Sequence, residues 1–482
     1  MRASSAATPV LASAAAVAVA LALGWSHGFL DPIALALVTL ATGATIVAIF
    51  TARTTTEAPA EPHPGRWPVG ILGLGVTLSL AYDALAPPGY FVRLDGLSAF
   101  RPLLHFISVL VATYLWRRPS GMLERVRFPL LVAAAAALGA TVIRASPRPH
   151  IDVWYFEQIG SMATLGGVNP YQVQYPNIYG PFTPNYAPAV LSADRSFVVG
   201  NPYLPLTLLL GTPTALLESD VRWVMLVLVV ISACALRRLG RNSRTAELAA
   251  VLLLVQPRAL FVLEQSWTEP IVLASFLLTL VAIDAWTRRT VAHVGDRADP
   301  AGWIATGIAG ALALGSKQYA PLLLAPVFFT VPTRGRWLAA LLAAGGAVLI
   351  IAPFALSDGP AFFHSVIALQ LEQPFRADAL SWPAAVARMG GPILPIWPAF
   401  VLAAATLSLG IRRAVSPERA ILAAAGAWTM LVLFNKQAFC NYYWLAVGLL
   451  CAAVAACARD RGQQHAAGDR GVAAAKPPSV QG

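Results

Sequence analysis

The feature that most constrains this chain is a succession of apolar runs, each about as long as a membrane-spanning helix. Short polar segments separate the runs, which continue to near residue 457. A helix needs about 20 mostly apolar residues to cross the hydrocarbon core of a bilayer. The sequence therefore predicts spans at 9–25, 32–50, 68–86, 100–116, 128–144, 221–237, 246–263, 270–286, 302–316, 318–332, 337–355, 392–411, 419–434 and 441–457.

Composition supports the same class of protein. Only 12% of the 482 residues are charged and 57% are hydrophobic, whereas an average soluble domain is roughly 25% charged. So few charges cannot cover a soluble globule of this size, which excludes a soluble multidomain enzyme, a disordered chain and a fibrous repeat. The sequence therefore predicts an all-α polytopic membrane protein whose surroundings are membrane lipids.

The net charge of +11 needs no nucleic-acid partner, because membrane proteins concentrate lysine and arginine in their cytoplasmic loops. We therefore place every arginine cluster on the cytoplasmic side of the plasma (inner) membrane. The clusters are Arg117/Arg118 with Arg125/Arg127, Arg237/Arg238 with Arg241/Arg244, Arg288/Arg289, Arg334/Arg336, Arg412/Arg413 and Arg459/Arg461. Both termini then lie inside, provided that residues 201–237 cross the membrane once.

This condition predicts that residues 204–217, interrupted by Pro205 and Pro213, form a half-helix or re-entrant piece on the outer side. Such backbone is tolerated only where protein or a watery cavity covers it. The first apolar run resembles a secretory signal peptide, but the second follows almost at once. We therefore expect the first run to remain as a transmembrane helix.

The chain divides into three predicted parts. Residues 1–127 form an N-terminal extension of four transmembrane helices, and residues 128–457 form the main transmembrane module, with a large outer loop at 145–203. Residues 458–482 are rich in Gly, Ala and Pro and carry charges of both signs, which predicts a disordered cytoplasmic tail. Most ionisable residues outside the arginine clusters are expected on the outer side. An ionisable residue within the membrane region is by default a candidate for a functional site.

Asp152 is the first of these residues. It opens the stretch 152–166, where Tyr155, Ile159 and Met162 are spaced as on one face of a short interfacial helix. Its carboxylate either caps this helix or acts as a general base that takes a proton from an acceptor hydroxyl. The two roles are compatible, because a cap also fixes the carboxylate in place.

The loop that follows, to about residue 205, is rich in proline and glycine, which predicts no regular structure. It contains the element 167–171, with Asn169 and Tyr171, and then further tyrosines that end at Tyr203. We expect these aromatic rings to pack against the membrane interface or a sugar ring. An ordinary interfacial belt of aromatic residues is the alternative.

Two similar turns carry lysine beside glutamine, at Lys317-Gln318 and Lys436-Gln437. Lysine is a compact cation with three donors and suits a phosphate. The alternative is an interfacial lysine that extends its amine to water. Lysines are disfavoured on the outer side of a membrane protein, so the pair favours a functional role.

The remaining outer charges leave several roles open. Glu264 and Glu269 flank a short turn. They could bind a divalent metal, support the base or pair with the lysines. The alternative is a solvated turn in which Glu269 begins a helix before Pro270. Arg376 either clamps a phosphate through two hydrogen bonds or pairs with Glu372. The sequence has no P-loop, Rossmann, HExxH or CxxC motif, so no cofactor is certain and a nucleotide-sugar donor has no obvious binding site.

The order of these motifs resembles that of the GT-C superfamily of integral-membrane glycosyltransferases over roughly residues 128–450. The motifs are a carboxylate just after a transmembrane helix, Gly-x-Asn-Pro-Tyr, the segment 203–206 (Tyr-Leu-Pro-Leu), and Lys-Gln at the outer end of a helix. The most similar members are the bacterial mannosyltransferase-like and arabinosyltransferase-like enzymes that use polyprenyl-phosphate sugars. The resemblance implies a bundle of about 13–15 transmembrane helices.

The resemblance also implies an inverting transfer on the extracytoplasmic face. A sugar, mannose or another hexose or pentose, would move from a polyprenyl-phosphate donor to a lipid or cell-envelope glycan acceptor. Asp152 corresponds to the catalytic carboxylate. Lys317 corresponds to the basic residue that binds the donor phosphate. Further donor-binding residues are Lys436, Arg376 and Gln318, and further substrate-binding residues are Tyr155, Asn169, Tyr171 and Tyr203.

The chain departs from the family pattern in two places, and three other functions stay open. The four-helix extension has no counterpart in the pattern, and residues 203–206 keep one of the two usual prolines. A multi-spanning transporter or a flippase for lipid-linked sugars would also explain the helices and buried charges. Transporters usually show inverted repeats. In this sequence the two Lys-Gln turns are the one sign of an internal repeat, and their surroundings differ. A non-catalytic scaffold would not need Asp152 or Lys317.

Overall fold

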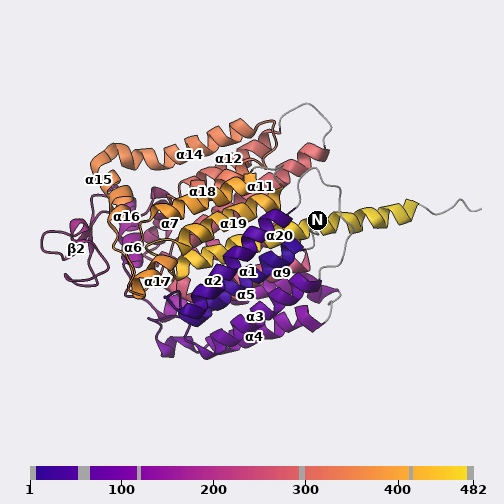
Figure 1. The fold of residues 1–482 in the computed structure, drawn as a ribbon, viewed down its shortest axis with the longest axis horizontal. Coiled ribbons are helices and arrows are strands. Elements are labelled where there is room, and N and C mark those ends of the chain that lie inside the picture. The colour runs from indigo at the N-terminus through magenta and orange to yellow at the C-terminus, as the bar shows by residue number, and fades with distance from the viewer. Residues whose placement is uncertain (1–6, 53–65, 117–120, 293–298, 412–415, 475–482) are drawn as a thin grey trace, which may run out of the picture.

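The computed structural model describes residues 7–52, 66–116, 121–292, 299–411 and 416–474, which form a bundle of roughly parallel helices (Figure 1). Within these residues, eight helical segments are long and apolar enough to cross a membrane, as predicted for an all-α polytopic membrane protein. The helices that carry them are α1 (Ala7–Ser26), α2 (Pro32–Thr51), α3 (Arg66–Leu85), α4 (Phe100–Trp116), α5 (Met122–Ala145), α11 (Glu269–Ala292), α14 (Arg336–Ser357) and α20 (Cys440–Ala474).

Shorter helices lie among these eight in the same bundle. They are α8 (Arg222–Leu239), α9 (Arg244–Val255), α10 (Ala259–Glu264), α12 (Pro300–Leu314), α13 (Ala320–Phe328), α18 (Trp397–Ile411) and α19 (Pro417–Leu433). The expected number of 13–15 spans depends on counting these shorter helices as well. The single span predicted at 246–263 is wrong, because α9 and α10 are separate helices. Pro257 lies between them and cannot donate a helical hydrogen bond, and Arg258 adopts a left-handed φ of 71°.

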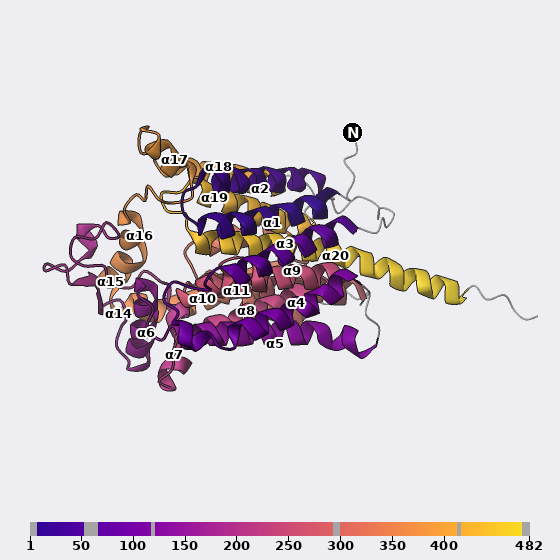
Figure 2. The same ribbon diagram turned by 90° about the horizontal axis from the view of Figure 1, so that it is seen from below.

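The two ends of the bundle differ in character (Figures 1 and 2). We call the end where α1 and α5 begin the arginine end, because Arg127 lies near the start of α5 and Arg237 in the last turn of α8. The final turns of α20 extend beyond this end. The opposite end, the loop end, carries α6 and the segments between α14 and α18. The clusters Arg117/Arg118 and Arg412/Arg413 lie outside the described residues.

The loop end contains short elements rather than long helices. These are η1 (Leu94–Leu97), α6 (Asp152–Leu165), β1 (Gln174–Pro176), η2 (Pro188–Val190), β2 (Phe197–Val199), α7 (Pro205–Leu216), α15 (Gly359–Phe363), the π-helical segment η3 (His364–Ala368), α16 (Leu369–Glu372) and α17 (Trp382–Arg388). Strands β1 and β2 pair antiparallel, with Gln174 opposite Val199. The outer loop predicted to lack regular structure therefore contains a small two-stranded sheet.

Helix α7 lies against α6 at the loop end (Figure 2). The Ser161 hydroxyl of α6 donates a hydrogen bond to the Leu208 carbonyl of α7 at 3.1 Å. Pro205 occupies the first position of α7, where a missing backbone N–H costs nothing. This short helix agrees with the half-helix expected at 204–217.

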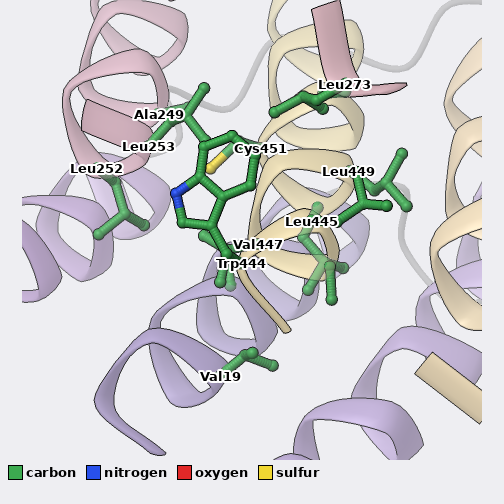
Figure 3. Packing of buried hydrophobic residues seen from close by; sticks show 14 of the residues in the cluster. Val19, Ala249, Leu252, Leu253, Leu273, Trp444, Leu445, Val447, Leu449 and Cys451 are labelled. Atoms are coloured by element: carbon green, nitrogen blue, oxygen red, sulfur yellow. The ribbon is translucent and has the colours of Figure 1, made fainter. Parts of the chain in front are cut away.

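The core of the bundle is centred on α20. Figure 3 shows Trp444 of α20 beside Leu252 and Leu253 of α9, and Val19 of α1 belongs to the same buried cluster. Small residues allow this close approach: a Cβ added at Gly448 would lie 2.5 Å from a methyl carbon of Leu273. The four N-terminal helices, expected as an extension, therefore share one hydrophobic core with the last helix of the chain.

The tail differs from the predicted disorder. Helix α20 continues beyond its apolar part as far as Ala474. Residues 458–474 contain many Ala, Arg and Gln residues, which favour helix and outweigh the three glycines among them. Residues 475–482 lie outside the described part of the chain.

Candidate active site

Asp152 is the first residue of α6 and its carboxylate is held by the outer loop. The cap position is Ile151, which makes no side-chain capping hydrogen bond, so Asp152 is not the N-cap residue. The Oδ1 atom of Asp152 accepts a hydrogen bond from the backbone N–H of Val153 at 2.8 Å and another from the Tyr179 hydroxyl at 3.2 Å. Its Oδ2 accepts one from the Tyr186 hydroxyl. The loop tyrosines, rather than a helix cap, therefore orient this carboxylate.

The surroundings of Asp152 also change its acidity. Desolvation raises the pKa of Asp152 above its ordinary value, although the hydrogen bonds from Tyr186, Val153 N–H and Tyr179 oppose the rise. Burial and the charge of Asp152 raise the pKa of both Tyr179 and Tyr186, so the two phenols keep their protons and act as donors. A carboxylate with a raised pKa is a better proton acceptor, as general-base catalysis requires.

Sequence reasoning missed the pairing of Asp152 with these two tyrosines. They lie 27 and 34 residues further along the chain. Their presence in a proline-rich loop indicated packing of some kind, but no spacing rule connects them to Asp152. The loop's fold, with Asn177 donating to the carbonyls of Gly180 and Arg195 at 2.9 Å, brings them there.

Lys317 lies between α12 and α13 and is only 9% exposed. Its Nζ is 3.5 Å from Oε1 of Glu269 and 4.7 Å from the centre of the Tyr203 ring. The Tyr319 hydroxyl donates to the same Oε1 at 3.1 Å. Among the roles left open for Glu269, the structure supports that of ion-pair partner to the lysine.

Tyr203 connects the lysine with the helix that carries Asp152. Its ring lies 6.3 Å from that of Phe156 on α6, and it belongs to one hydrophobic cluster with Phe156 and Tyr186. Burial, followed by the charges of Asp152, Glu157 and Glu269, raises the pKa of Tyr203. Asp152, through Tyr186, and Lys317, through Tyr203, therefore reach the same aromatic cluster.

Glu157 is a further carboxylate that sequence reasoning missed. It lies one and a half turns after Asp152 on α6 and is fully buried. The Ser266 hydroxyl donates to its Oε2, whereas Oε1 has no hydrogen-bond partner among the described residues. Burial raises the pKa of Glu157 well above its ordinary value, and the charge of Lys317 opposes this. The burial of Glu157 depends on the packing of α6 against the turn before α11, where Ser266 lies.

Glu264 does not join this group. Its carboxylate accepts hydrogen bonds from the backbone N–H groups of Tyr90 and Phe91, both at 2.7 Å, and a Cβ on Gly89 would lie 2.3 Å from it. Glu264 therefore fastens the segment after α3 to the bundle, and its predicted role in a metal pair with Glu269 is not supported. The described residues contain no group of three or more His, Cys, Asp or Glu suited to a metal ion.

Lys436 and Arg376 hold loops together. Lys436 Nζ donates to the Leu371 carbonyl at 2.8 Å, and desolvation lowers the pKa of Lys436. Arg376 makes two hydrogen bonds to Asp378, at 2.8 and 2.7 Å, and a third to Oδ1 of Asn185 at 3.0 Å. Among the described residues the salt-bridge partner of Arg376 is therefore Asp378 rather than the expected Glu372, because Asp378 lies within reach of Nε and Nη2 of the guanidinium.

The other predicted site residues mostly position the loop. Gln318 Nε2 donates to the carbonyls of Pro202 and Val366, both at 3.1 Å. The Tyr171 hydroxyl donates to the Tyr203 carbonyl at 2.8 Å, and Asn169 Nδ2 donates to Ser357 at 2.6 Å. Tyr155 packs edge-on against Trp154.

Comparison with known protein families, with curated protein sequences and with solved structures finds no match for this chain. The class that the fold defines is a multi-pass helical membrane protein. At its loop end Asp152, Glu157, Glu269 and Lys317 all lie close enough to Tyr203 to act on it, the three carboxylates through their charges and Lys317 at 4.7 Å from the ring.

Proposed function

We propose that this protein is an inverting glycosyltransferase that uses a polyprenyl-phosphate sugar as donor and a lipid or cell-envelope glycan as acceptor. The observation that carries the proposal is the meeting of Asp152 and Lys317 at one aromatic cluster, through Tyr186 and Tyr203. A general base and a cation that contact one cluster of aromatic side chains are the two charged groups that such a transfer needs.

In the proposed reaction, Asp152 takes the proton of the acceptor hydroxyl. The acceptor oxygen forms a bond to the anomeric carbon while the bond from that carbon to the phosphate oxygen breaks. The bonding electrons leave with polyprenyl phosphate, and Lys317 stabilises the charge that develops there. The attack comes from the face opposite the phosphate, so the configuration inverts without a covalent enzyme intermediate.

The burial of Lys317 supports a donor that is carried in the membrane. A polyprenyl chain lies in the bilayer, so its phosphate reaches the protein at interface depth. Lys317 lies at a break between two short apolar helices, with Glu269 balancing its charge. The lysine ammonium is a compact cation with three hydrogen-bond donors on a flexible stem. The ammonium of Lys317 can therefore exchange Glu269 for a phosphate by a side-chain rotation alone.

The test is glycosyl transfer by membranes that contain the protein, supplied with a panel of radiolabelled polyprenyl-phosphate sugars. Wild-type protein should move label from one donor to a lipid or glycan product, and Asp152→Asn should not. Asp194→Asn is the matched control, because Asp194 lies exposed in the same loop and accepts hydrogen bonds from its near neighbours Ser192 and Ser196. Movement of intact lipid-linked sugar across the bilayer without transfer would support the flippase alternative instead.

A further inference from the structure

Four exposed arginines gather at the loop end, where α4 begins and α5 ends. Arg93 immediately precedes η1 and Arg101 lies in the first turn of α4, whereas Arg144 and Arg148 lie in and just after the last turn of α5. The two segments touch, because the backbone N–H of Arg93 donates to the Ala145 carbonyl at 2.8 Å and α4 packs against α5. We call these four arginines the loop-end patch.

The loop-end patch has few opposing charges. Residues 91–101 and 144–150 contain four arginines and a single carboxylate, Asp95. Asp95 pairs with Arg93 at 3.2 Å, and the Arg144 guanidinium lies 5.8 Å from the centre of the Trp223 ring. Among the described residues, no hydrogen bond or ion pair engages the guanidinium groups of the other two arginines. The patch therefore keeps two cations available for an external partner.

The loop-end patch lies at the depth of lipid headgroups. Arg101 is near the start of one candidate membrane span, and Arg144 is at the end of the next. A long basic side chain at the end of a spanning helix extends its charge to the membrane interface, where phospholipid phosphates lie. On the orientation expected from the sequence this is the outer side, where arginine is disfavoured. Such a concentration of arginines there indicates a specific anionic partner.

The surface of α4 below the patch suits acyl chains. Helix α4 lies at the edge of the bundle (Figure 1) and most of its residues are exposed. Phe106 and Val109 are exposed within about two turns of Arg101, and Leu94 of η1 is exposed beside Arg93. Cationic side chains at a helix end, followed by an apolar helix surface, match the two parts of a phospholipid.

We infer that the loop-end patch binds an anionic phospholipid, with its headgroup at the arginines and its acyl chains along α4. Guanidinium groups suit phosphate, because their fixed donors match two phosphate oxygens at once. A zwitterionic lipid offers the same phosphate but also brings an ammonium group towards the cations, so charge complementarity favours an anionic headgroup. This inference is independent of the proposed glycosyl transfer.

The test is photo-cross-linking of the full-length protein in lipid nanodiscs, with cross-linked peptides identified by mass spectrometry. The probe is phosphatidylglycerol with a photoreactive group in one acyl chain, diluted into phosphatidylcholine. Label should concentrate on residues 94–109, and a phosphatidylcholine probe with the same reactive group should label them far more weakly. Arg101→Gln/Arg148→Gln should raise the mole fraction of probe needed for half-maximal labelling by about 30-fold, because each arginine near an anionic lipid contributes about a factor of five.

The matched control is Arg195→Gln/Arg388→Gln, which removes the same charge from the loop end. Arg195 lies over the Phe182 ring and Arg388 donates to the Leu30 carbonyl at 3.4 Å, so both are away from α4 and α5. Labelling of residues 94–109 should not change in this variant. The single variant Arg148→Gln, which leaves α4 intact, should show about a fivefold effect.

Three results would overturn the inference. They are equal labelling of residues 94–109 by the two probes, unchanged labelling in Arg101→Gln/Arg148→Gln, and equal loss in the control variant. Unlabelled phosphatidylglycerol should displace the probe. Displacement by inorganic phosphate instead would assign the patch to a soluble anion and reject the lipid. Because the two replaced guanidinium groups have no partner among the described residues, the melting temperature of Arg101→Gln/Arg148→Gln should match that of the wild type.

Discussion

The buried carboxylates at the two ends of the bundle have different surroundings. At the arginine end, both oxygens of Glu247 are satisfied, by Arg237 at 2.9 Å and by Arg127 and Tyr114 at 3.3 and 2.9 Å. At the loop end, Glu157 and Glu269 each keep one oxygen without a hydrogen-bond partner among the described residues. A buried polar atom without a partner costs free energy. The Glu247 carboxylate is therefore fully bonded, although Arg127 Nε beside it has no partner among the described residues, whereas the two loop-end carboxylates keep oxygens that a ligand or reaction would use.

The largest expected effect on activity comes from replacing the proposed base, Asp152. Asp152→Asn should lower kcat for glycosyl transfer by about 10²–10⁴-fold, the usual contribution of a general base, with little change in thermal stability. Asp194→Asn should retain full activity. Unchanged transfer in Asp152→Asn would end the assignment of Asp152.

The two lysines should differ in the same assay. Lys317→Ala should reduce kcat/KM for the donor by about 10²–10³-fold, because it removes a cation from the developing phosphate charge. Lys436 donates to loop carbonyls, so Lys436→Ala should change the melting temperature more than the donor kinetics. Equal kinetic losses in the two variants would remove the special role of Lys317.

The arginine end should respond in stability rather than activity. Glu247→Ala leaves Arg127 buried without its carboxylate and should cost about 3–5 kcal/mol in the free energy of unfolding. Glu124→Ala, an exposed glutamate at the start of α5, is the control and should change little. Denaturation followed by intrinsic fluorescence measures both. A neutral Glu247→Ala would mean that this cluster is not structural.

The pH dependence of transfer tests the surroundings of Asp152. The base acts when it is deprotonated, so activity should rise with pH through the pKa of Asp152. Burial raises that pKa, so the acidic limb of kcat/KM should lie above the value of about 3.9 typical of aspartate. Tyr186→Phe removes a hydrogen bond that favours the charged form and should move the limb higher. A limb at or below the ordinary value would contradict this environment.

The smallest expected effect concerns Glu157. Its pKa is raised in the folded state, so the unfolded chain releases this proton at lower pH than the folded protein does. Stability should therefore decrease as pH rises from about 4.3, the ordinary glutamate value, towards the folded pKa. Glu157→Gln should remove this decrease and give equal or higher thermal stability at neutral pH. A large loss of stability at pH 7 would show that the charge of Glu157 is needed.

The site was only partly predictable from sequence. Asp152 and Lys317 stood out because single charges in apolar surroundings are conspicuous, and the helix expected at 152–166 is present as α6. Glu264 was grouped with Glu269 because the two are neighbours in sequence, yet it bonds to the backbone of residues 90 and 91. Glu157 cannot be predicted as a buried carboxylate, because nothing in its local sequence shows which face of α6 becomes buried.

The sequence by itself determined the multi-pass helical class, because apolar runs of this length leave few other structures. Only the tertiary structure decided the partners of each carboxylate, because Tyr179 and Tyr186 reach Asp152 across a long loop. Only the tertiary structure likewise united the first and last helices in one core, to which both Val19 and Trp444 belong (Figure 3). Spacing along a chain governs local periodicity, whereas contacts between distant segments depend on how the helices pack.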